Sequence, residues 1–344
     1  MAEQATNDII NPPVEERLPA DTRNCLVVSY DLETTGLSSD DEIIQVGAYT
    51  YIPAGTRSSE FSQFILPATR HIHPEAACKI GLKVHEGNLY DTRTKSVVPT
   101  VTESEGLLLF LKWLTSVKEG YDGIVLVSHG AIFLDIPVLI RAIQRTGMSE
   151  SFFQVVLGFC DSNAIFQEDN SRCYRSLSLQ HLYQNFVGSR RQVHRAAEDA
   201  KDLYTLLSRY FKVESLSLDI PRLEMYTYTF RCMEFYSKWK YYVDVKIEGL
   251  RVIVRNQRKT SEKKKTIILR NLVAAGYDIQ NLLDDFSKSP SEQSFKEELK
   301  RRIQVMKSNH ESYLLDTRIV SVEEVINAVT ASELYLSRRS LHPQ

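Results

Sequence analysis

Long apolar runs are absent from this chain of 344 residues, and cysteine is rare. No stretch has the length that spans a bilayer, and the acidic, polar start lacks the apolar core of a signal peptide. The five cysteines form no C-x-x-C pair, and their odd number fits neither a disulfide framework nor a zinc site. We therefore expect reduced thiols, no membrane partner, and a cytoplasmic or nuclear location.

An excess of charge of either sign is also missing, since 42 Lys and Arg residues face 44 Asp and Glu residues and the net charge is -2. A protein that is basic throughout is thereby excluded, and any contact with nucleic acid needs a local basic patch. The apolar content of 43% is ordinary for a globular protein. The chain has room for one large or two medium domains and contains no internal repeat.

Hydrophobic patterning predicts a mixed α/β domain. Three strands come first and are expected to form an antiparallel meander, because the connections between them are short. Helices and strands then alternate, and Thr102 with Glu105 forms a capping box before the first of these helices. The predicted strands are 25–30, 43–49, 61–66, 124–127 and 155–159, and the predicted helices include 107–114, 135–145, 177–186 and 194–210.

The composition changes after this domain, where a basic and aromatic stretch precedes a helical pattern. Two helix starts are predicted in the helical part. One combines Ser289, Pro290 and Glu292, and the other combines Ser321 and Glu324. The predicted segments are a flexible leader over 1–22, the mixed α/β domain over 23–213, a basic connecting segment over 214–265, a small helical domain over 266–335 and a tail over 336–344.

Three short motifs place acidic residues and a histidine where predicted strands and helices meet. The first, Asp-Leu-Glu-Thr-Thr-Gly at 31–36, directly follows the first strand. The second, Ser-His-Gly-Ala-Ile-Phe-Leu-Asp at 128–135, links a strand to a helix, and the third, His-Arg-Ala-Ala-Glu-Asp at 194–199, opens another helix. The candidate catalytic and metal-binding residues are Asp31, Glu33, Asp135, His194 and Asp199.

Divalent metal is the physical reason why four carboxylates could share one pocket, because without cations they would repel each other. Asp31 and Glu33 lie on the same face of a strand, since strand side chains alternate with a period of two. The five-residue offset between His194 and Asp199 places the histidine on the loop that enters the helix. Carboxylates suit Mg²⁺ or Mn²⁺, two such ions can hydrolyse a phosphodiester, and histidine is the natural general base.

Each motif also has an ordinary structural interpretation when it is taken alone. An Asp-x-Glu pair can simply end a strand, and Asp135 can simply begin a helix. His194 could be a surface or capping residue, and Asp202 competes with Asp199 one turn further along the same helix. The three motifs occur together and in order, and this combination favours a two-metal nuclease site.

The motifs resemble those of the DEDDh 3′–5′ exonucleases, the DnaQ-like branch of the ribonuclease H-like fold. The resemblance implies a two-metal site with His194 as the general base. The implied ligands of the two Mg²⁺ or Mn²⁺ ions are Asp31, Glu33, Asp135 and Asp199. The second motif is similar to that of three-prime repair exonucleases, although Gly130 stands where Asn is usual and Leu134 where an aromatic residue is usual. These departures concern the pocket shape and the substrate contacts.

Longer segments resemble a narrower group, the Exuperantia family of insect maternal RNA-localisation proteins. The segments that carry this resemblance are 41–50, 110–114, 122–129 and 276–279, and it extends more loosely over most of 24–335. It implies an exonuclease-like domain followed by a SAM-like helical domain, in an RNA-binding homodimer. Members of that family can carry an inactive exonuclease site, whereas every DEDDh position is filled here.

Residues 231–270 form a local basic patch, with twelve Lys or Arg residues against four Asp or Glu residues. Interleaved aromatic side chains could stack on the bases of single-stranded or looped RNA: Phe235, Tyr236, Trp239, Tyr241 and Tyr242. The alternative is a core strand over 241–247 followed by a solvated charge run, with 263–265 as a localisation signal or linker. The predicted nucleic-acid-binding residues are Arg251, Arg255, Arg258, Lys259, Lys263, Lys264 and Lys265.

We predict an Exuperantia-like RNA-binding protein of the cytoplasm that takes part in mRNA localisation and retains an active 3′–5′ exonuclease site. RNA with a single-stranded or structured 3′ region is the expected partner. One alternative is a non-catalytic RNA-binding scaffold, and a further alternative is a three-prime repair DNA exonuclease. The filled ligand positions favour an exonuclease, whether it acts on RNA or on DNA, over the scaffold. The Exuperantia resemblance and the helical C-terminal part favour an RNA-binding protein, whether catalytic or not, over the DNA exonuclease.

Overall fold

The computed structural model describes residues 16–18, 24–38, 40–52, 57–168, 174–189, 194–257, 260–309 and 321–332. Its contacts divide into an N-terminal unit, Glu16–Ser237, and a C-terminal unit that starts at Lys238. The division falls inside a long helix, α9 (Phe230–Leu250). Among the described residues, no helix combines the length and the hydrophobicity that crossing a membrane requires.

The N-terminal unit is built on a six-stranded sheet in the order β3-β2-β1-β7-β8-β9. Strand β1 pairs antiparallel with β2 and parallel with β7, while β2 and β3 pair antiparallel. The predicted meander and the mixed sheet are therefore confirmed. The strands are β1 (Cys25–Thr34), β2 (Ile43–Ile52), β3 (Arg57–Phe64), β7 (Gly123–Ser128), β8 (Val156–Asp161) and β9 (Thr227–Thr229).

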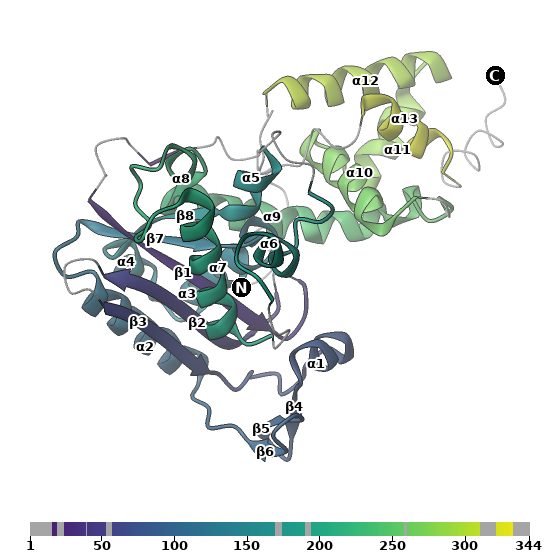
Figure 1. Ribbon diagram of the computed structural model, residues 1–344. Helices are drawn as coiled ribbons and strands as arrows, with labels where there is room; N and C mark the ends of the chain where they lie inside the picture. The colour runs from purple at the N-terminus through teal and green to yellow at the C-terminus, as the bar shows by residue number, and fades with distance from the viewer. Residues whose placement is uncertain are drawn as a thin grey trace. The chain divides into compact units, whose positions relative to one another are not determined.

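Helices cover both faces of this sheet. Figure 1 shows α7 lying across β1 and β2, and the helix contacts both strands. On the other face α2 packs through Phe110, whose ring centroid is 5.2 Å from that of Phe61 on β3. The predicted capping box of Thr102 and Glu105 is confirmed at the start of α2. The helices are α2 (Glu103–Val117), α3 (Asp135–Arg145), α4 (Ser149–Phe153), α5 (Ser162–Gln167), α6 (Leu179–Phe186), α7 (Ala196–Phe211) and α8 (Pro221–Met225).

The backbone of α7 rests directly on strand β2 at Gly47. A Cβ atom at this position would lie 2.0 Å from Ala196 C and 2.0 Å from Ala197 N, so only glycine permits the approach. Gln45, two residues earlier on the same face of β2, accepts a hydrogen bond from Ala196 N at 3.2 Å and so satisfies a free donor of the first helical turn. This contact places the start of α7 beside the end of β1.

A small module follows β3 that the sequence analysis did not predict. It consists of α1 (Pro74–Ile80) and a three-stranded sheet of β4 (Leu82–His85), β5 (Asn88–Asp91) and β6 (Ser96–Val97). Ile80, Leu82 and Leu89 form its core together with Ile44 and Ile72. The apolar cluster is small, and the strands are too short to show a clear period in the sequence.

Arg195 joins this module to the start of α7. Its Nη1 donates to the Ile80 carbonyl at 2.6 Å, and its guanidinium pairs with the Asp91 carboxylate. Arg195 itself is the residue before the first helical position of α7. The module is therefore attached where the third sequence motif begins.

The described part of the C-terminal unit is helical, as predicted from the sequence. After the last turns of α9 it contains α10 (Glu262–Ala274), α11 (Ile279–Lys288), α12 (Glu292–Asn309) and α13 (Val322–Thr330). The capping box of Ser321 and Glu324 is confirmed. The finer assignment of this unit as SAM-like remains a prediction.

Two local expectations are wrong. Ser289 does not open α12, because it closes α11 with its backbone N–H bonded to Asp285 O, and Ser291 caps the next helix by accepting from Ser294 N at 3.1 Å. The alternative of a core strand over 241–247 is also wrong, because these residues lie within α9.

Part of the predicted leader is attached to the sheet. Arg17 forms an antiparallel bridge with Tyr228 of β9, and Leu18 N donates to Thr227 O at 3.3 Å. Residues 1–15 and 19–23 of the leader lie outside the described part of the chain.

We expect Gly47→Ala to lower the free energy of unfolding by about 3 kcal/mol or more, because the added methyl group overpacks a contact between two backbones. Urea denaturation followed by circular dichroism measures this change. Gly249→Ala is the control, since a Cβ there meets only Ile279 Cγ2 at 3.9 Å inside a helix. A Gly47→Ala protein as stable as the control variant would contradict the close approach.

Candidate metal centre

Three of the five candidate residues converge at the end of β1. Glu33, His194 and Asp199 each offer a ligand atom, and these atoms lie within 4.8 Å of one another. Glu33 lies near the end of β1, where it pairs in register with Gln45 of β2. Asp199 lies in the first turn of α7, where its N–H donates to Arg195 O at 2.9 Å. The contact between α7 and Gly47 brings the two elements to this distance.

His194 lies two residues before the first residue of α7, on the entering segment that the sequence predicted for it. Its backbone φ is 45°, in the left-handed region that residues other than glycine rarely adopt. The neighbouring Arg195, anchored on Ile80 and Asp91, holds this conformation in place. An unfavourable backbone conformation that is held by its surroundings is a frequent property of functional residues.

The other two candidates flank this group. Asp31 precedes Glu33 by two residues on the same face of β1 and pairs in register with Gly47. Asp135 is the first residue of α3, and its Oδ2 accepts a hydrogen bond of 2.6 Å from Ser128 Oγ at the end of β7. Neither Asp31 nor Asp135 belongs to the group of ligand atoms within 4.8 Å.

Buried negative charge dominates the electrostatics of the site. Burial raises the pKa of the Glu33 carboxyl to about 7, and the charge of Asp199 adds to the rise while Lys79 opposes it. Burial also raises the pKa of Asp135 to about 7, although the hydrogen bond from Ser128 opposes the rise. Both carboxyls therefore bind a proton more tightly than ordinary carboxyls do, and a divalent cation that binds there would displace this proton.

This donor set fits hard divalent cations. The ligand atoms of Glu33 and Asp199 are oxygens, and His194 adds one nitrogen within the same 4.8 Å group. Mg²⁺ and Mn²⁺ prefer such oxygen-rich surroundings, and a cation would remove the repulsion that raises the pKa of Glu33. The positive charge of Lys79 in α1 lowers the pKa of both Glu33 and Asp135.

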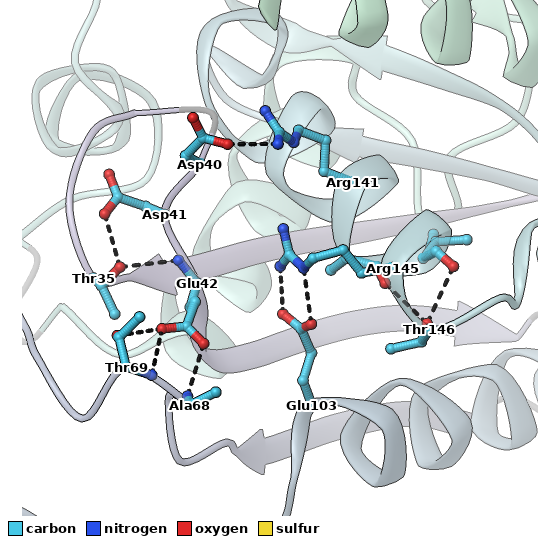
Figure 2. Close-up of polar contacts among 12 residues, drawn as sticks. Thr35, Asp40, Asp41, Glu42, Ala68, Thr69, Glu103, Arg141, Arg145 and Thr146 are labelled. Atoms are coloured by element: carbon cyan, nitrogen blue, oxygen red, sulfur yellow. Dashed lines mark hydrogen bonds and ion pairs between the residues drawn. The ribbon is translucent and has the colours of Figure 1, made fainter. Parts of the chain in front are cut away.

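The turn that follows Glu33 is closed by its own side chains (Figure 2). Thr35 Oγ1 donates to Asp41 Oδ1 at 2.8 Å and accepts from Glu42 N at 2.9 Å. The Glu42 carboxylate in turn accepts from Ala68 N at 2.7 Å. A Cβ at Gly36 would lie 2.6 Å from Asp41 Oδ2 and 2.7 Å from His73 Cδ2, so a larger residue would displace these two side chains. The Thr-Thr-Gly part of the motif thus fixes the position of the strand end.

The second motif organises the loop that precedes Asp135. His129 Nε2 donates to Leu177 O at 2.6 Å, which leaves Nδ1 to meet Ser162 Oγ at 2.9 Å. Gly130 has a φ of 72°, in the region that Gly and Asn tolerate best, which explains why the two can replace each other there. Its N–H donates to Asp161 Oδ1 at 2.8 Å.

The site also depends on three residues that the sequence motifs did not predict as candidates: Asp161, Gln45 and Arg195. Asp161 is fully buried and also accepts from Asn163 N at 2.9 Å, while burial raises its pKa. It stabilises the loop and belongs to no ligand group. Its hydrogen bonds to Gly130 N, Ile132 N and Asn163 N reveal this role.

Three of the predicted nucleic-acid-binding residues gather in the C-terminal unit. Arg251, Arg255 and Lys265 line a cavity of about 450 Å³. Its remaining lining is Val252, Val254, Thr266 and Leu269. Cations around an apolar floor suit a phosphate group joined to a flat base.

The other predicted cations differ in their surroundings. Lys264 pairs with Glu324 of α13, so its charge is already compensated. Lys263 lies in α10, but its side chain is outside the described part of the structure, and so are Arg258 and Lys259. Arg251 of the cavity also forms an ion pair of 2.6 Å with Glu248.

The expected stacking surface of aromatic residues is only partly present. Tyr236 and Trp239 are buried at 2% and 3% exposure, so stacking on bases is excluded for them. Phe235 and Tyr241 are exposed at 47% and 40%. The helical period of α9, in place of the strand considered from the sequence, determines which of these rings face solvent.

Comparison with known proteins shows what the N-terminal unit is similar to. Residues 25–185 match the family model of the Exuperantia RNase H-like domain. The maternal protein exuperantia of Drosophila melanogaster is 27% identical over 166 residues, which are 46% of this chain and 30% of that protein. Maternal protein exuperantia-1 of Drosophila pseudoobscura pseudoobscura is 28% identical over 156 residues, 43% of this chain and 30% of that protein. The matched segment thus covers less than a third of these relatives.

Two solved structures are similar to the chain at low sequence identity. One is the zinc-bound complex of Escherichia coli ExoI with single-stranded DNA, with 14% identity, a TM-score of 0.43, and coverage of 59% of this chain and 42% of that chain. The other shows recognition of the histone mRNA stem-loop by a 3′-exonuclease, with 11% identity, a TM-score of 0.43, and coverage of 56% and 83%.

We expect Glu33→Gln to change how the stability of the metal-free protein depends on pH. The pKa of Glu33 is raised from 4.5 to about 7, so the folded wild type binds more protons than the unfolded chain between these values and loses stability as the pH rises through them. Glutamine removes this loss, and the variant should gain on the order of 1 kcal/mol or more over wild type between pH 5 and pH 8.

Urea denaturation at a series of pH values in EDTA measures the difference. Glu119→Gln, at an exposed glutamate after α2, is the control and should follow wild type. Parallel profiles for wild type and Glu33→Gln would show that folding does not raise the pKa of Glu33.

Proposed function

We propose that the N-terminal unit is a metal-dependent 3′–5′ exonuclease acting on RNA, within an RNA-binding protein of the Exuperantia type that serves mRNA localisation. The convergence of Glu33, His194 and Asp199 is the observation that carries this proposal. Asp31, on the same strand as Glu33, and Asp135, at the start of α3, add two flanking carboxylates. The homodimer and the cytoplasmic location implied by the resemblance are part of the same proposal.

Four carboxylates would hold the two Mg²⁺ or Mn²⁺ ions: Asp31, Glu33, Asp135 and Asp199. Bound ions of this kind lower the pKa of water and stabilise the leaving oxygen of a phosphodiester. The residues of the chain fix where this happens, because Ser128 orients Asp135 and the contact at Gly47 fixes Asp199 relative to Glu33.

His194 would take the proton of the attacking water. Its ring lies within 4.8 Å of the carboxylate oxygens of Glu33 and Asp199, whose negative charge stabilises the imidazolium that forms. Its position ahead of α7 leaves the ring on a segment that is anchored by Arg195. General-base catalysis of this kind contributes typically about 10²–10⁴ in rate.

A non-catalytic RNA-binding scaffold is the second candidate function. It is favoured by the positions of Asp31 and Asp135 outside the 4.8 Å group. In such a protein the pocket would hold an RNA end without cleaving it. Activity measurements separate the two candidates.

We expect the full chain to shorten 3′-ended RNA stepwise with Mn²⁺ or Mg²⁺, and RNA faster than DNA. EDTA should stop the reaction, and His194→Ala and Asp199→Asn should each slow it at least about 100-fold. Oligomers labelled at the 5′ or the 3′ end, separated on denaturing gels, give the rate and the direction.

Asp202→Asn is the matched control for Asp199→Asn, because both residues belong to α7 and Asp202 is not in the ligand group among the described residues. It should retain the rate of wild type. Intact RNA and DNA under all metal conditions, with RNA still bound tightly, would overturn the enzyme and support the scaffold. Degradation of DNA in preference to RNA would favour a repair-type exonuclease.

The cavity in the C-terminal unit is the proposed RNA-binding surface. Arg251, Arg255 and Lys265 line its wall, and of these Arg251 also pairs with Glu248. Lys264 is not part of the lining and pairs with Glu324. Phosphate contacts of this kind release counterions and make the affinity fall with salt. Of the seven predicted nucleic-acid-binding residues, we therefore propose the three that line the cavity as the RNA contacts.

We expect Arg255→Gln to weaken RNA binding and to reduce the slope of log affinity against log salt by roughly 0.7, the value for one phosphate contact with a single strand. Fluorescence anisotropy with labelled RNA in EDTA measures both quantities. Lys264→Gln, the control within the same basic run, should change neither. A stronger effect of Lys264→Gln than of Arg255→Gln would place the RNA elsewhere.

A further inference from the structure

The face of β2 that carries Gln45 and Gly47 continues with two tyrosines. Because strand side chains alternate, Tyr49 and Tyr51 also point toward α7. The Tyr49 ring meets the Tyr204 ring of α7 edge to face, with centroids 5.3 Å apart and planes at 65°. The helix thus touches the strand at Gly47, whereas aromatic rings separate the two elements further along.

A cavity of about 590 Å³ lies at this aromatic end of α7. Its lining is Tyr49, Tyr51, Tyr204, Thr205, Ser208, Arg209, Lys212, Val213 and Glu214. The volume is within the range of about 300–1,000 Å³ that small-molecule sites occupy. Asp199 belongs to the first turn of α7 and Lys212 caps its C-terminus, which puts them roughly 20 Å apart along a helix that rises about 1.5 Å per residue. The cavity is therefore separate from the candidate metal centre.

The lining combines aromatic rings with positive charge. Tyr49 and Tyr51 provide ring surfaces, and the cationic groups of Arg209 and Lys212 stand on α7 and its C-cap. Lys212 has a φ of 59°, a left-handed conformation that glycine usually provides at this place. A lysine there retains the helix C-cap and adds a charge to the cavity wall.

Two hydroxyl groups of the lining differ in how they are used. The Tyr204 hydroxyl accepts from Leu216 N at 3.2 Å, which fixes the ring. The Ser208 Oγ is buried and has no hydrogen-bond partner among the described residues. A buried hydroxyl without a partner is costly, and a ligand or an ordered water would satisfy it.

We propose that this cavity binds a nucleoside monophosphate, either free or as one nucleotide of a single-stranded RNA. A base stacks favourably on tyrosine rings, and a phosphate pairs with Arg209 and Lys212. The carboxylate of Glu214 accepts hydrogen bonds from ribose hydroxyls or from N–H groups of a base. The proposal goes beyond the exonuclease site and does not depend on catalysis.

Isothermal titration calorimetry of the full chain in EDTA tests the proposal, because EDTA excludes binding through metal at the carboxylates. The probes are AMP, GMP, CMP and UMP, the four nucleosides, and inorganic phosphate. A nucleoside monophosphate should bind at least about tenfold more tightly than its nucleoside or phosphate alone, because charge-assisted contacts and stacking act together. No binding of any monophosphate would overturn the proposal.

Variants of the lining assign the binding to this cavity. The double substitution Arg209→Gln and Lys212→Gln should weaken binding about tenfold or more. Tyr51→Ala should weaken it as well, whereas Tyr51→Phe retains the ring and should bind like wild type. Arg145→Gln is the control, since Arg145 pairs with Glu103 elsewhere in the N-terminal unit. Equal affinity in the double variant and in the control would overturn the assignment.

A competition experiment with RNA distinguishes a free nucleotide from a nucleotide within an RNA chain. A short single-stranded RNA that displaces the bound monophosphate, and that loses this ability in the double variant, identifies a nucleotide within a chain. A monophosphate that only free nucleotides displace identifies a free ligand. Both outcomes support the proposal, and both are readable whether or not the chain cleaves RNA.

Discussion

The contact between Gly47 and the first turn of α7 determines the positions on which the rest of the N-terminal unit depends. Without a side chain at this point, the helix backbone rests on β2, and the start of α7 comes beside the end of β1. Glu33 and Asp199 meet for this reason. The same strand face carries tyrosines further along, where the helix and the strand are separated and a second cavity forms. One close approach thus determines the positions of the candidate metal centre and of the second cavity, at the two ends of α7.

The close approach also concentrates negative charge in a buried place. Burial raises the pKa of Glu33 and of Asp135 to about 7, which means that charging these carboxyls costs free energy in the folded protein. A fold gains nothing in stability from such a cluster. Divalent cations would account for the arrangement, because their charge offsets the repulsion between the carboxylates and bound cations can activate a water molecule. Arg195 and Lys79 compensate only part of the charge.

Sequence reasoning predicted features that have a strong local signal. Helix α3 has the predicted bounds, and the capping boxes at Thr102 and Ser321 are confirmed, because these patterns depend on neighbouring residues. The module after β3 has short strands and a small core, so its sequence shows no period. Gln45 and Gly47 act on a helix about 150 positions away, and no local pattern reveals such a partner. Within α9, residues 241–247 could be taken for a strand because apolar residues alternate there, although imperfectly.

The most direct test of this account is calorimetric titration of the full chain with Mn²⁺ at neutral pH, in two buffers that differ in ionisation enthalpy. We predict that Mn²⁺ binds and that protons are released, because carboxyls with a pKa of about 7 give up their protons to the cation. Asp199→Asn should abolish this binding. Wild type that takes up no Mn²⁺ at millimolar concentration, or that binds it as Asp199→Asn does, would contradict a metal centre at the end of β1.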